Sequence, residues 1–239
     1  RYDMGQVTLT ASRYEQRLSE NTVSIEILKP SIINNTNTIV IDEVLDKVPG
    51  VQMLDGQANI RGGSGYSYGA GSRVMLLLDG IPALQADSGF PNWGDMPVEA
   101  VGKLEILKGA GSALYGSAAL NGIVNLQRTF ATEKPVTELA LSYGQYYTPA
   151  REETRWWDSA PYEFNASAIH KQRFQHLDLI LHGRINRLES YNADTYEHRN
   201  RVGGNLRYRL NNQWTIQLNT LFNFAEKSNF FLWKDSRKH

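Results

Sequence analysis

The chain has 239 residues, of which 41% are hydrophobic, and this length and composition suit one or two folded domains rather than a disordered tail or a collagen-like repeat. Its 25 basic residues balance 25 acidic residues, so no net charge attracts it to nucleic acid, which we do not expect as a partner. Cysteine is absent, which excludes a disulfide framework and thiolate metal sites.

The first elements along the chain are short. Residues 7–10 and 22–28 show the apolar alternation of β-strands. Residues 38–48 then predict an amphipathic helix, because their apolar side chains recur at helical intervals and Pro49 followed by Gly50 stops the pattern. Helix and strand signals therefore follow each other within the first 50 residues.

More strands and helical turns follow up to about residue 128. The run 74–79 is apolar throughout, as expected of a strand that is buried on both faces, whereas 103–108 alternates like a half-buried strand. Further strands are expected at 51–54 and 58–61, and helical turns at 98–101 and 112–115. We predict that residues 1–130 form an α+β domain with a small mixed sheet and short helices.

Residues 131–239 behave differently, because apolar and polar residues alternate with a period of two. The alternating segments lie around residues 138–143, 164–168, 177–181, 202–210 and 214–224. Transmembrane β-strands need about 9 to 11 residues, with one face towards lipid and the other towards a polar lumen. We expect about five antiparallel strands of an outer-membrane β-barrel, although a soluble β-sandwich also shows this alternation.

The lengths of the links between these segments favour the barrel. The links at 148–161 and 189–200 are long, while those at 172–175 and 211–213 are short, and outer-membrane barrels show this asymmetry. Five strands cannot close a barrel, and open edges in lipid would leave backbone groups unsatisfied. We therefore expect the chain to be the first part of a longer barrel.

No enzyme motif is found. The glycines between residues 62 and 71 form neither a P-loop nor a dinucleotide-binding fingerprint, and no Gly-x-Ser-x-Gly nucleophile elbow occurs. The histidines are spread over different alternating segments without metal-ligand spacing, so we predict no metal, no cofactor and no enzymatic activity.

An ordered series of short motifs resembles the TonB-dependent outer-membrane receptors. The motifs are residues 7–16 (VTLTASRYEQ), 48–51 (VPGV), 60–63 (IRGG), 77–82 (LLDGIP) and 104–125 (LEILKGAGSALYGSAALNGIVN). Their order and spacing match that family's plug domain. Residues 126–129 (LQRT) depart from it, because the family usually continues with a more apolar strand.

The resemblance implies that the chain consists of two domains with different roles. Residues 1–130 would be the plug with an N-terminal TonB-box-like segment, and residues 131–239 would be the N-terminal portion of the barrel. A complete member would carry about 22 strands, whose wide lumen the plug fills. The implied location is the Gram-negative outer membrane, in contact with lipid, with the plug accessible from the periplasm.

The resemblance also implies that the protein TonB is a partner. TonB would bind an extended segment by strand addition, in which main-chain hydrogen bonds supply the affinity. The predicted segment is Gln6, Val7, Thr8, Leu9 and Thr10. Two alternatives are that this segment is an edge strand of the plug and that the box lies upstream of Arg1.

Substrate would first meet the apical loops of the plug at residues 64–72 and 82–97. Aromatic and amide side chains there suit a small-ligand site. The predicted contacts are Tyr66, Tyr68, Gln85, Phe90, Asn92 and Trp93. Three charged residues at motif positions, Arg61, Glu105 and Lys108, are expected to pair with charges on the barrel wall.

These features predict active import of a scarce nutrient, such as a siderophore-iron complex, cobalamin or a glycan, in which the plug gates the barrel. The sequence does not choose among these cargoes. A structural or adhesive outer-membrane barrel and a soluble periplasmic binding module remain as alternatives.

Overall fold

The computed structural model describes residues 8–9, 16–17, 24–29, 40–54, 56–63, 73–155, 157–192, 194–211 and 213–228. The chain forms two compact units, Arg1–Thr129 and Phe130–His239. Each unit is described below by itself. No helix in the described part is long and apolar enough to cross a membrane.

A five-stranded mixed sheet organises the first unit, with the strand order β3-β8-β9-β6-β7. Strands β6 and β9 are parallel, and the other neighbours are antiparallel. The strands are β3 (Ile25–Leu28), β6 (Val74–Leu78), β7 (Ile81–Pro82), β8 (Val101–Leu107) and β9 (Gly122–Arg128). This arrangement confirms the predicted α+β class.

Shorter elements surround this sheet. Strands β4 (Val51–Leu54) and β5 (Gln57–Ile60) form a separate hairpin, as do β1 (Thr8–Leu9) and β2 (Gln16–Arg17). The helices are α2 (Ile41–Leu45), η3 (Trp93–Asp95), η4 (Val98–Ala100), α3 (Ser112–Tyr115) and η5 (Ser117–Ala119).

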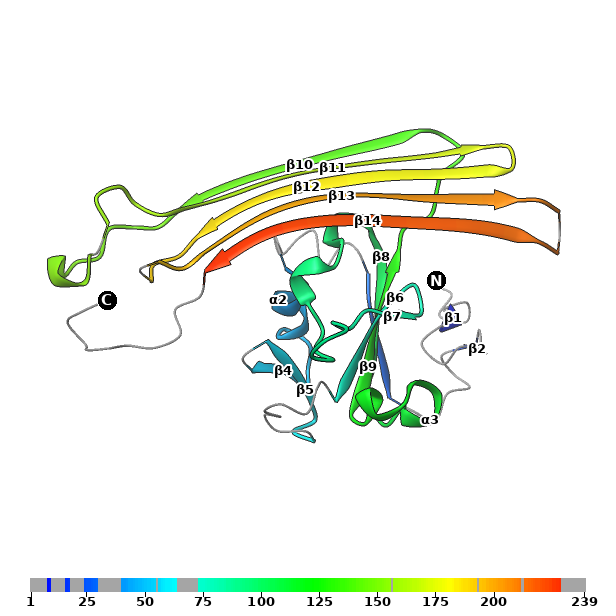
Figure 1. Ribbon diagram of the computed structural model, residues 1–239, viewed down its shortest axis with the longest axis horizontal. Coiled ribbons are helices and arrows are strands. Elements are labelled where there is room, and N and C mark those ends of the chain that lie inside the picture. The colour runs from blue at the N-terminus through cyan, green and yellow to red at the C-terminus, as the bar shows by residue number, and fades with distance from the viewer. Residues whose placement is uncertain are drawn as a thin grey trace, which may run out of the picture. The chain divides into compact units, whose positions relative to one another are not determined.

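Two hydrophobic cores cover opposite faces of the sheet, because successive residues of a strand point to opposite faces. Leu76 of β6 packs in the core that contains α2, whereas Leu77 packs in the core that contains Tyr115 of α3. Figure 1 shows α2 and α3 on opposite sides of the sheet. Full burial of each such aliphatic side chain contributes about 1.5–3 kcal/mol, so the two cores hold the unit together from both sides.

Two predicted elements differ in detail from those observed. The helix expected over 38–48 is shorter in the structure, where α2 spans Ile41–Leu45 and turns follow it up to Gly50. The strand expected to be half-buried near 103–108 is buried from Leu104 to Leu107, because both of its faces are covered. Alternation on its own does not show that the polar residues of a strand face water.

The second unit is an open antiparallel sheet in which each strand pairs with the next one in sequence. Figure 1 shows its long strands lying side by side. They are β10 (Val136–Gln145), β11 (Tyr162–Phe174), β12 (Leu177–Glu189), β13 (Tyr196–Arg209) and β14 (Thr215–Ser228). The predicted run of antiparallel strands is confirmed.

The link at 146–161 is long and the turn at 175–176 is short, as the sequence predicts, but the links at 190–195 and 210–214 are nearly equal in length. Residues 146–161, which include η6 (Glu152–Thr154), and residues 190–195 connect strands at one end, which we call the loop end. The turns at 175–176 and 210–214 connect them at the other end, the turn end. Asn211 shapes the second turn, since its Oδ1 accepts hydrogen bonds from the backbone N–H groups of Gln213 and Trp214, each at 2.8 Å.

Candidate functional site

The predicted TonB-binding segment lies at the N-terminus. Of its residues, Thr8 and Leu9 form β1, which pairs antiparallel with β2 in the register Thr8 to Arg17 and Leu9 to Gln16. Gln6, Val7 and Thr10 lie outside the described residues. Among the described residues, β1 is paired with β2.

The candidate ligand loop after β7 is closed by its own backbone. The N–H of Gln85 donates to the carbonyl of Phe90 at 2.9 Å, and the N–H of Gly89 donates to the carbonyl of Gln85 at 2.9 Å. Gln85 is exposed, and Phe90 and Asn92 are half-buried. The structure thus presents Gln85 on a compact loop with Phe90 at its base.

Two other predicted contacts, Tyr66 and Tyr68, lie outside the described residues. Trp93 requires a correction. Its side chain is 4% exposed and packs in the α2 core, and its indole Nε1–H donates to the carbonyl of Gly56 at 2.8 Å. A large aromatic side chain with its one donor satisfied is stabilised in a core, so Trp93 supports the loop from beneath and does not offer a face to a ligand.

Glu105 and Lys108 also require a correction, because both are engaged inside the first unit. Glu105 is fully buried on the sheet, where its carboxylate pairs with Lys103 at 2.8 Å and accepts a hydrogen bond from Asn125 Nδ2 at 3.2 Å. Lys108 forms an ion pair with Glu26 of β3 and donates to the carbonyl of Pro49 at 2.6 Å. These charges stabilise the unit from within, since buried charges need such partners.

Arg61 is the third residue that was expected to contact the wall, and it is exposed. It occupies the left-handed region with φ of 55°, and Gly62 follows with φ of 65°. The Arg61 N–H donates to the carbonyl of Gly50 at 2.8 Å, which ties the turn after β5 to the turn before β4. Its side chain remains available on the surface of the unit.

A further ion pair, which the sequence did not indicate, links the β6–β7 turn to β9. Asp79 and Gly80 have φ of 52° and 79°, the values of a tight hairpin turn. The Asp79 carboxylate accepts hydrogen bonds from the backbone N–H of Arg128 at 2.8 Å and from its Nε at 2.6 Å. Arg128 belongs to the segment 126–129 that departs from the family pattern, and pairing with Asp79 gives this departure a structural role.

The second unit has one polar and one apolar face. On the polar face, Arg184 Nε donates to Asn165 Oδ1 at 2.6 Å and to Asn186 Oδ1 at 3.0 Å. Asp178 accepts from Arg173 Nε at 2.7 Å and from Arg209 Nη1 at 2.9 Å. The exposed large residues of the apolar face include Leu139, Leu141, Tyr143, Phe174, Leu181, Ile185, Val202, Leu206, Tyr208, Ile216, Leu218, Phe222 and Phe224.

A sheet with one polar and one apolar face suits a transmembrane β-barrel, in which one face contacts lipid and the other lines a polar lumen. Residues 17–123 match the family model of the TonB-dependent Receptor Plug Domain. Residues 17–123 therefore form a plug domain of the TonB-dependent receptor type. The first unit accordingly contains this plug domain, and the second has the fold of the barrel strands in solved structures of such receptors.

Relatives with known names include vitamin B12 transporters of two Vibrio species. The vitamin B12 transporter BtuB of Vibrio cholerae is 29% identical over 139 residues, which cover 58% of this chain and 23% of that protein. BtuB of Vibrio vulnificus strain CMCP6 is 31% identical over the same length, with the same coverage. The chain therefore spans about a quarter of the length of these relatives.

Solved structures share the fold at low identity. The siderophore receptor PirA from Pseudomonas aeruginosa has a TM-score of 0.65 and 19% identity over 87% of this chain and 36% of that one. PirA from Acinetobacter baumannii has a TM-score of 0.67 and 17% identity over 91% of this chain and 33% of that one.

Proposed function

We propose that this receptor actively imports a scarce nutrient across the outer membrane, with the plug gating the barrel and TonB supplying the energy. The observation that carries the proposal is the presence on one chain of a plug domain and of strands with one polar and one apolar face. An adhesive barrel or a soluble binding module would have no need for this combination.

The cargo we propose is a metal chelate. The relatives named above transport vitamin B12, a cobalt chelate, and the structural neighbours are siderophore receptors. A glycan remains the second candidate cargo. We propose that the cargo first contacts Gln85, Phe90 and Asn92 on the loop after β7, together with Tyr66 and Tyr68.

A panel of cargoes tests this assignment. Cells that depend on the receptor are supplied with cobalamin, ferric siderophores or oligosaccharides at limiting concentration, and uptake of each labelled cargo is measured. We expect one chelate to be taken up, and Gln85→Ala to raise its Kd several-fold. Uptake of an oligosaccharide alone would contradict the chelate assignment and leave active import intact.

We further propose that TonB binds residues 6–10 by strand addition. The support is that β1 pairs with β2 on one side and, within the part of the chain that the structure describes, with no strand on its other side, where a strand of TonB can add through main-chain hydrogen bonds. Few particular side chains are needed for such pairing, which makes the segment tolerant of sequence variation.

Calorimetry with the periplasmic domain of TonB tests this contact. The full-length receptor is compared with a variant that lacks residues 1–12, both loaded with cargo. Loss of binding on truncation is the expected result. Equal binding would place the TonB contact elsewhere, and no binding to either form would contradict the TonB-dependent mechanism itself.

A further inference from the structure

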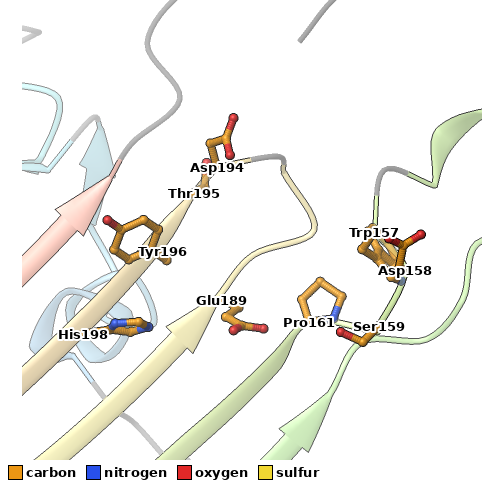
Figure 2. A pocket seen from close by; sticks show the side chains of 9 residues that line it. All are labelled: Trp157, Asp158, Ser159, Pro161, Glu189, Asp194, Thr195, Tyr196 and His198. Carbon is orange, nitrogen blue, oxygen red and sulfur yellow. The ribbon is translucent and has the colours of Figure 1, made fainter.

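The second unit contains a pocket at its loop end, between the β10–β11 and β12–β13 connections. Its volume is about 450 Å³, within the range of roughly 300–1,000 Å³ that is typical of small-molecule sites. Figure 2 shows residues of the first connection on one side, residues of β13 on the other and Glu189 between them. The lining residues are Trp157, Asp158, Ser159, Pro161, Glu189, Asp194, Thr195, Tyr196 and His198.

The ladder between β12 and β13 places an arginine between this pocket and the exposed apolar residues of the same face. Glu189, Arg187 and Ile185 follow one another on that face, because side chains two residues apart in a strand share a face. From the loops inwards, the paired positions are Glu189 with Tyr196, Arg187 with His198, Ile185 with Asn200 and Gly183 with Val202. We call the exposed residues Leu181, Ile185, Val202 and Leu206 the apolar strip.

Neutral oxygens hold the guanidinium of Arg187, which is half-buried. Its Nη1 donates to the carbonyls of Asn186 at 2.7 Å and Arg199 at 3.5 Å, and its Nη2 donates to Asn200 Oδ1 at 3.0 Å. Among the described residues, no carboxylate pairs with this cation, and the three bonds leave two of its five N–H groups. A guanidinium with donors to spare suits a phosphate, which it binds through paired hydrogen bonds.

The pocket, one step further towards the loops, carries the opposite charge. Its described lining includes the carboxylates of Asp158, Glu189 and Asp194 and neither lysine nor arginine. Arg155 borders this lining, since its Nε donates to the carbonyl of Trp157 at 2.9 Å. Three carboxylates exceed the charge of that guanidinium, so the pocket favours a small cation.

Two side chains of the pocket are fixed in positions that suit a protonated amine. Glu189 Oε2 accepts a hydrogen bond from the backbone N–H of Tyr162 at 3.1 Å. The hydroxyl of Tyr196 donates to Glu226 Oε1 at 3.1 Å, and its ring centroid lies 5.0 Å from that of His198. A carboxylate accepts hydrogen bonds from an ammonium group, and an aromatic face attracts its charge.

The order of groups on this face is therefore apolar, cationic and anionic, from the apolar strip to the loops. Phosphatidylethanolamine has the complementary order of acyl chains, phosphate and protonated amine, with an ethylene group between the last two. Because a strand rises about 3.3 Å per residue, Arg187 and Glu189 lie about 7 Å apart along β12. Their long side chains can close this distance onto the two charges of one head group.

We propose that this face binds phosphatidylethanolamine, with its phosphate on Arg187, its amine in the pocket beside Glu189 and its acyl chains along the apolar strip. Phosphatidylglycerol lacks the amine and would leave its phosphate near the Glu189 carboxylate. Phosphatidylcholine has the same charges, but its quaternary ammonium donates no hydrogen bond. The proposal requires that the apolar face meets lipid, and it is independent of import.

Lipid competition on the intact receptor tests the proposal. The full-length receptor is placed in nanodiscs that contain equal amounts of phosphatidylethanolamine, phosphatidylcholine and phosphatidylglycerol with identical acyl chains. The lipids retained after partial delipidation are counted by native mass spectrometry. We expect phosphatidylethanolamine to be retained at least fivefold over phosphatidylglycerol and at least threefold over phosphatidylcholine. Retention no greater than that of either comparison lipid would overturn the proposal.

Two variants separate the phosphate contact from the amine contact. Arg187→Gln should lower the retention of phosphatidylethanolamine at least threefold and should also lower that of phosphatidylglycerol, because both lipids place a phosphate on this cation. Glu189→Gln keeps an acceptor for the Tyr162 N–H while removing the charge. It should lower the retention of phosphatidylethanolamine at least threefold but raise that of phosphatidylglycerol.

Matched controls are Arg151→Gln and Glu153→Gln, which change exposed charges of the β10–β11 connection that do not line the pocket. Both should leave lipid retention unchanged, with heat-modified gel mobility used to confirm folding of all variants. Unchanged retention in both Arg187→Gln and Glu189→Gln would refute the site. A parallel loss of all three lipids in Glu189→Gln would show a merely structural role for Glu189 and would also refute the amine contact.

A soluble competitor separates a lipid site from a site for the free head group. Dihexanoyl phosphatidylethanolamine should displace the bound lipid at a concentration at least tenfold lower than free phosphoethanolamine does, because its chains also cover the apolar strip. Equal potency of the two competitors would show that the strip takes no part, and would overturn the lipid proposal in favour of a site for free phosphoethanolamine.

Discussion

At the scale of single residues, close packing in the plug depends on the absence of a side chain at Gly122. A Cβ at this position would lie 2.5 Å from the carbonyl oxygen of Leu107 and 2.6 Å from Ile60 Cδ1. The first of these atoms is backbone in the neighbouring strand β8, so it cannot move without disturbing the ladder between β8 and β9. This glycine lies in the long motif 104–125, and its role there is steric.

Gly122→Ala should therefore destabilise the plug by about 1–3 kcal/mol, the usual cost of overpacking a core. Hydrogen exchange of the β9 amides in the full receptor measures this change, since a loss of about 1.4 kcal/mol speeds exchange through local opening roughly tenfold. Gly144→Ala is the control, because its added Cβ would come no closer than 4.0 Å to Glu163 Cβ. Equal protection in the two variants would contradict the steric role.

Residue types in the sequence predicted where the chain turns better than they predicted which side chains are buried. The turn at Asp79 and Gly80 could be predicted, because the left-handed conformation suits this dipeptide. The burial of Glu105 and Trp93 could not, since each depends on partners distant in sequence, Asn125 and Gly56. Tertiary packing decided whether these side chains met solvent.

At the scale of elements, the alternation in β10–β14 assigns each residue to a face. Leu139 and Ala140 are neighbours in β10 and both are exposed, yet they pair with Ala168 and Ser167 on opposite faces of β11. The first should face lipid and the second the polar lumen. This pair permits a direct comparison of the two faces at almost the same depth.

Leu139→Arg should weaken folding into lipid vesicles by about 2–4 kcal/mol, the cost of a cation at the middle of the lipid face. Ala140→Arg should change it by less than about 1 kcal/mol, because its side chain enters a polar environment. Urea titration of vesicle-inserted receptor, read from heat-modified gel mobility, measures both. A similar cost for the two variants would mean that the faces are assigned incorrectly.

The period-two pattern predicted the strands of the second unit but not all of their ends. The link expected at 189–200 is shorter in the structure and comprises residues 190–195. Strand β13 begins at Tyr196, and its first residues are polar. Charged and aromatic residues such as Glu197 and His198 look like loop in sequence. They pair as strand here because the ladder to β12 continues beyond the apolar band.

At the scale of the whole molecule, the proposed import requires that force on the N-terminal segment reaches the plug. Val7→Pro removes a main-chain donor from the proposed TonB segment. We expect uptake of the cargo to fall at least tenfold, with surface display and cargo affinity unchanged. Radiolabelled uptake and equilibrium binding on the same cells measure both quantities, and unchanged uptake would place the TonB segment elsewhere.

The two-part organisation could be predicted because each part has its own signal, short motifs with tight turns in the plug and long alternation in the barrel strands. The crossover that places β6 beside β9 in parallel could not be read from these patterns. It depends on which strands share the two cores, and local periodicity carries no information about neighbours.

The long link at 146–161 and the tight turns at the opposite end of the second unit restrict where this protein can change in length. At the turn end, an inserted residue would have to be absorbed by a tight turn such as the one that Asn211 organises, or it would shift a strand by one position and exchange its two faces. At the loop end, residues 146–161 can lengthen without altering any ladder. Epitope tags and natural insertions should therefore be tolerated at residues 146–161 of the loop end and should disrupt the sheet at the turn end.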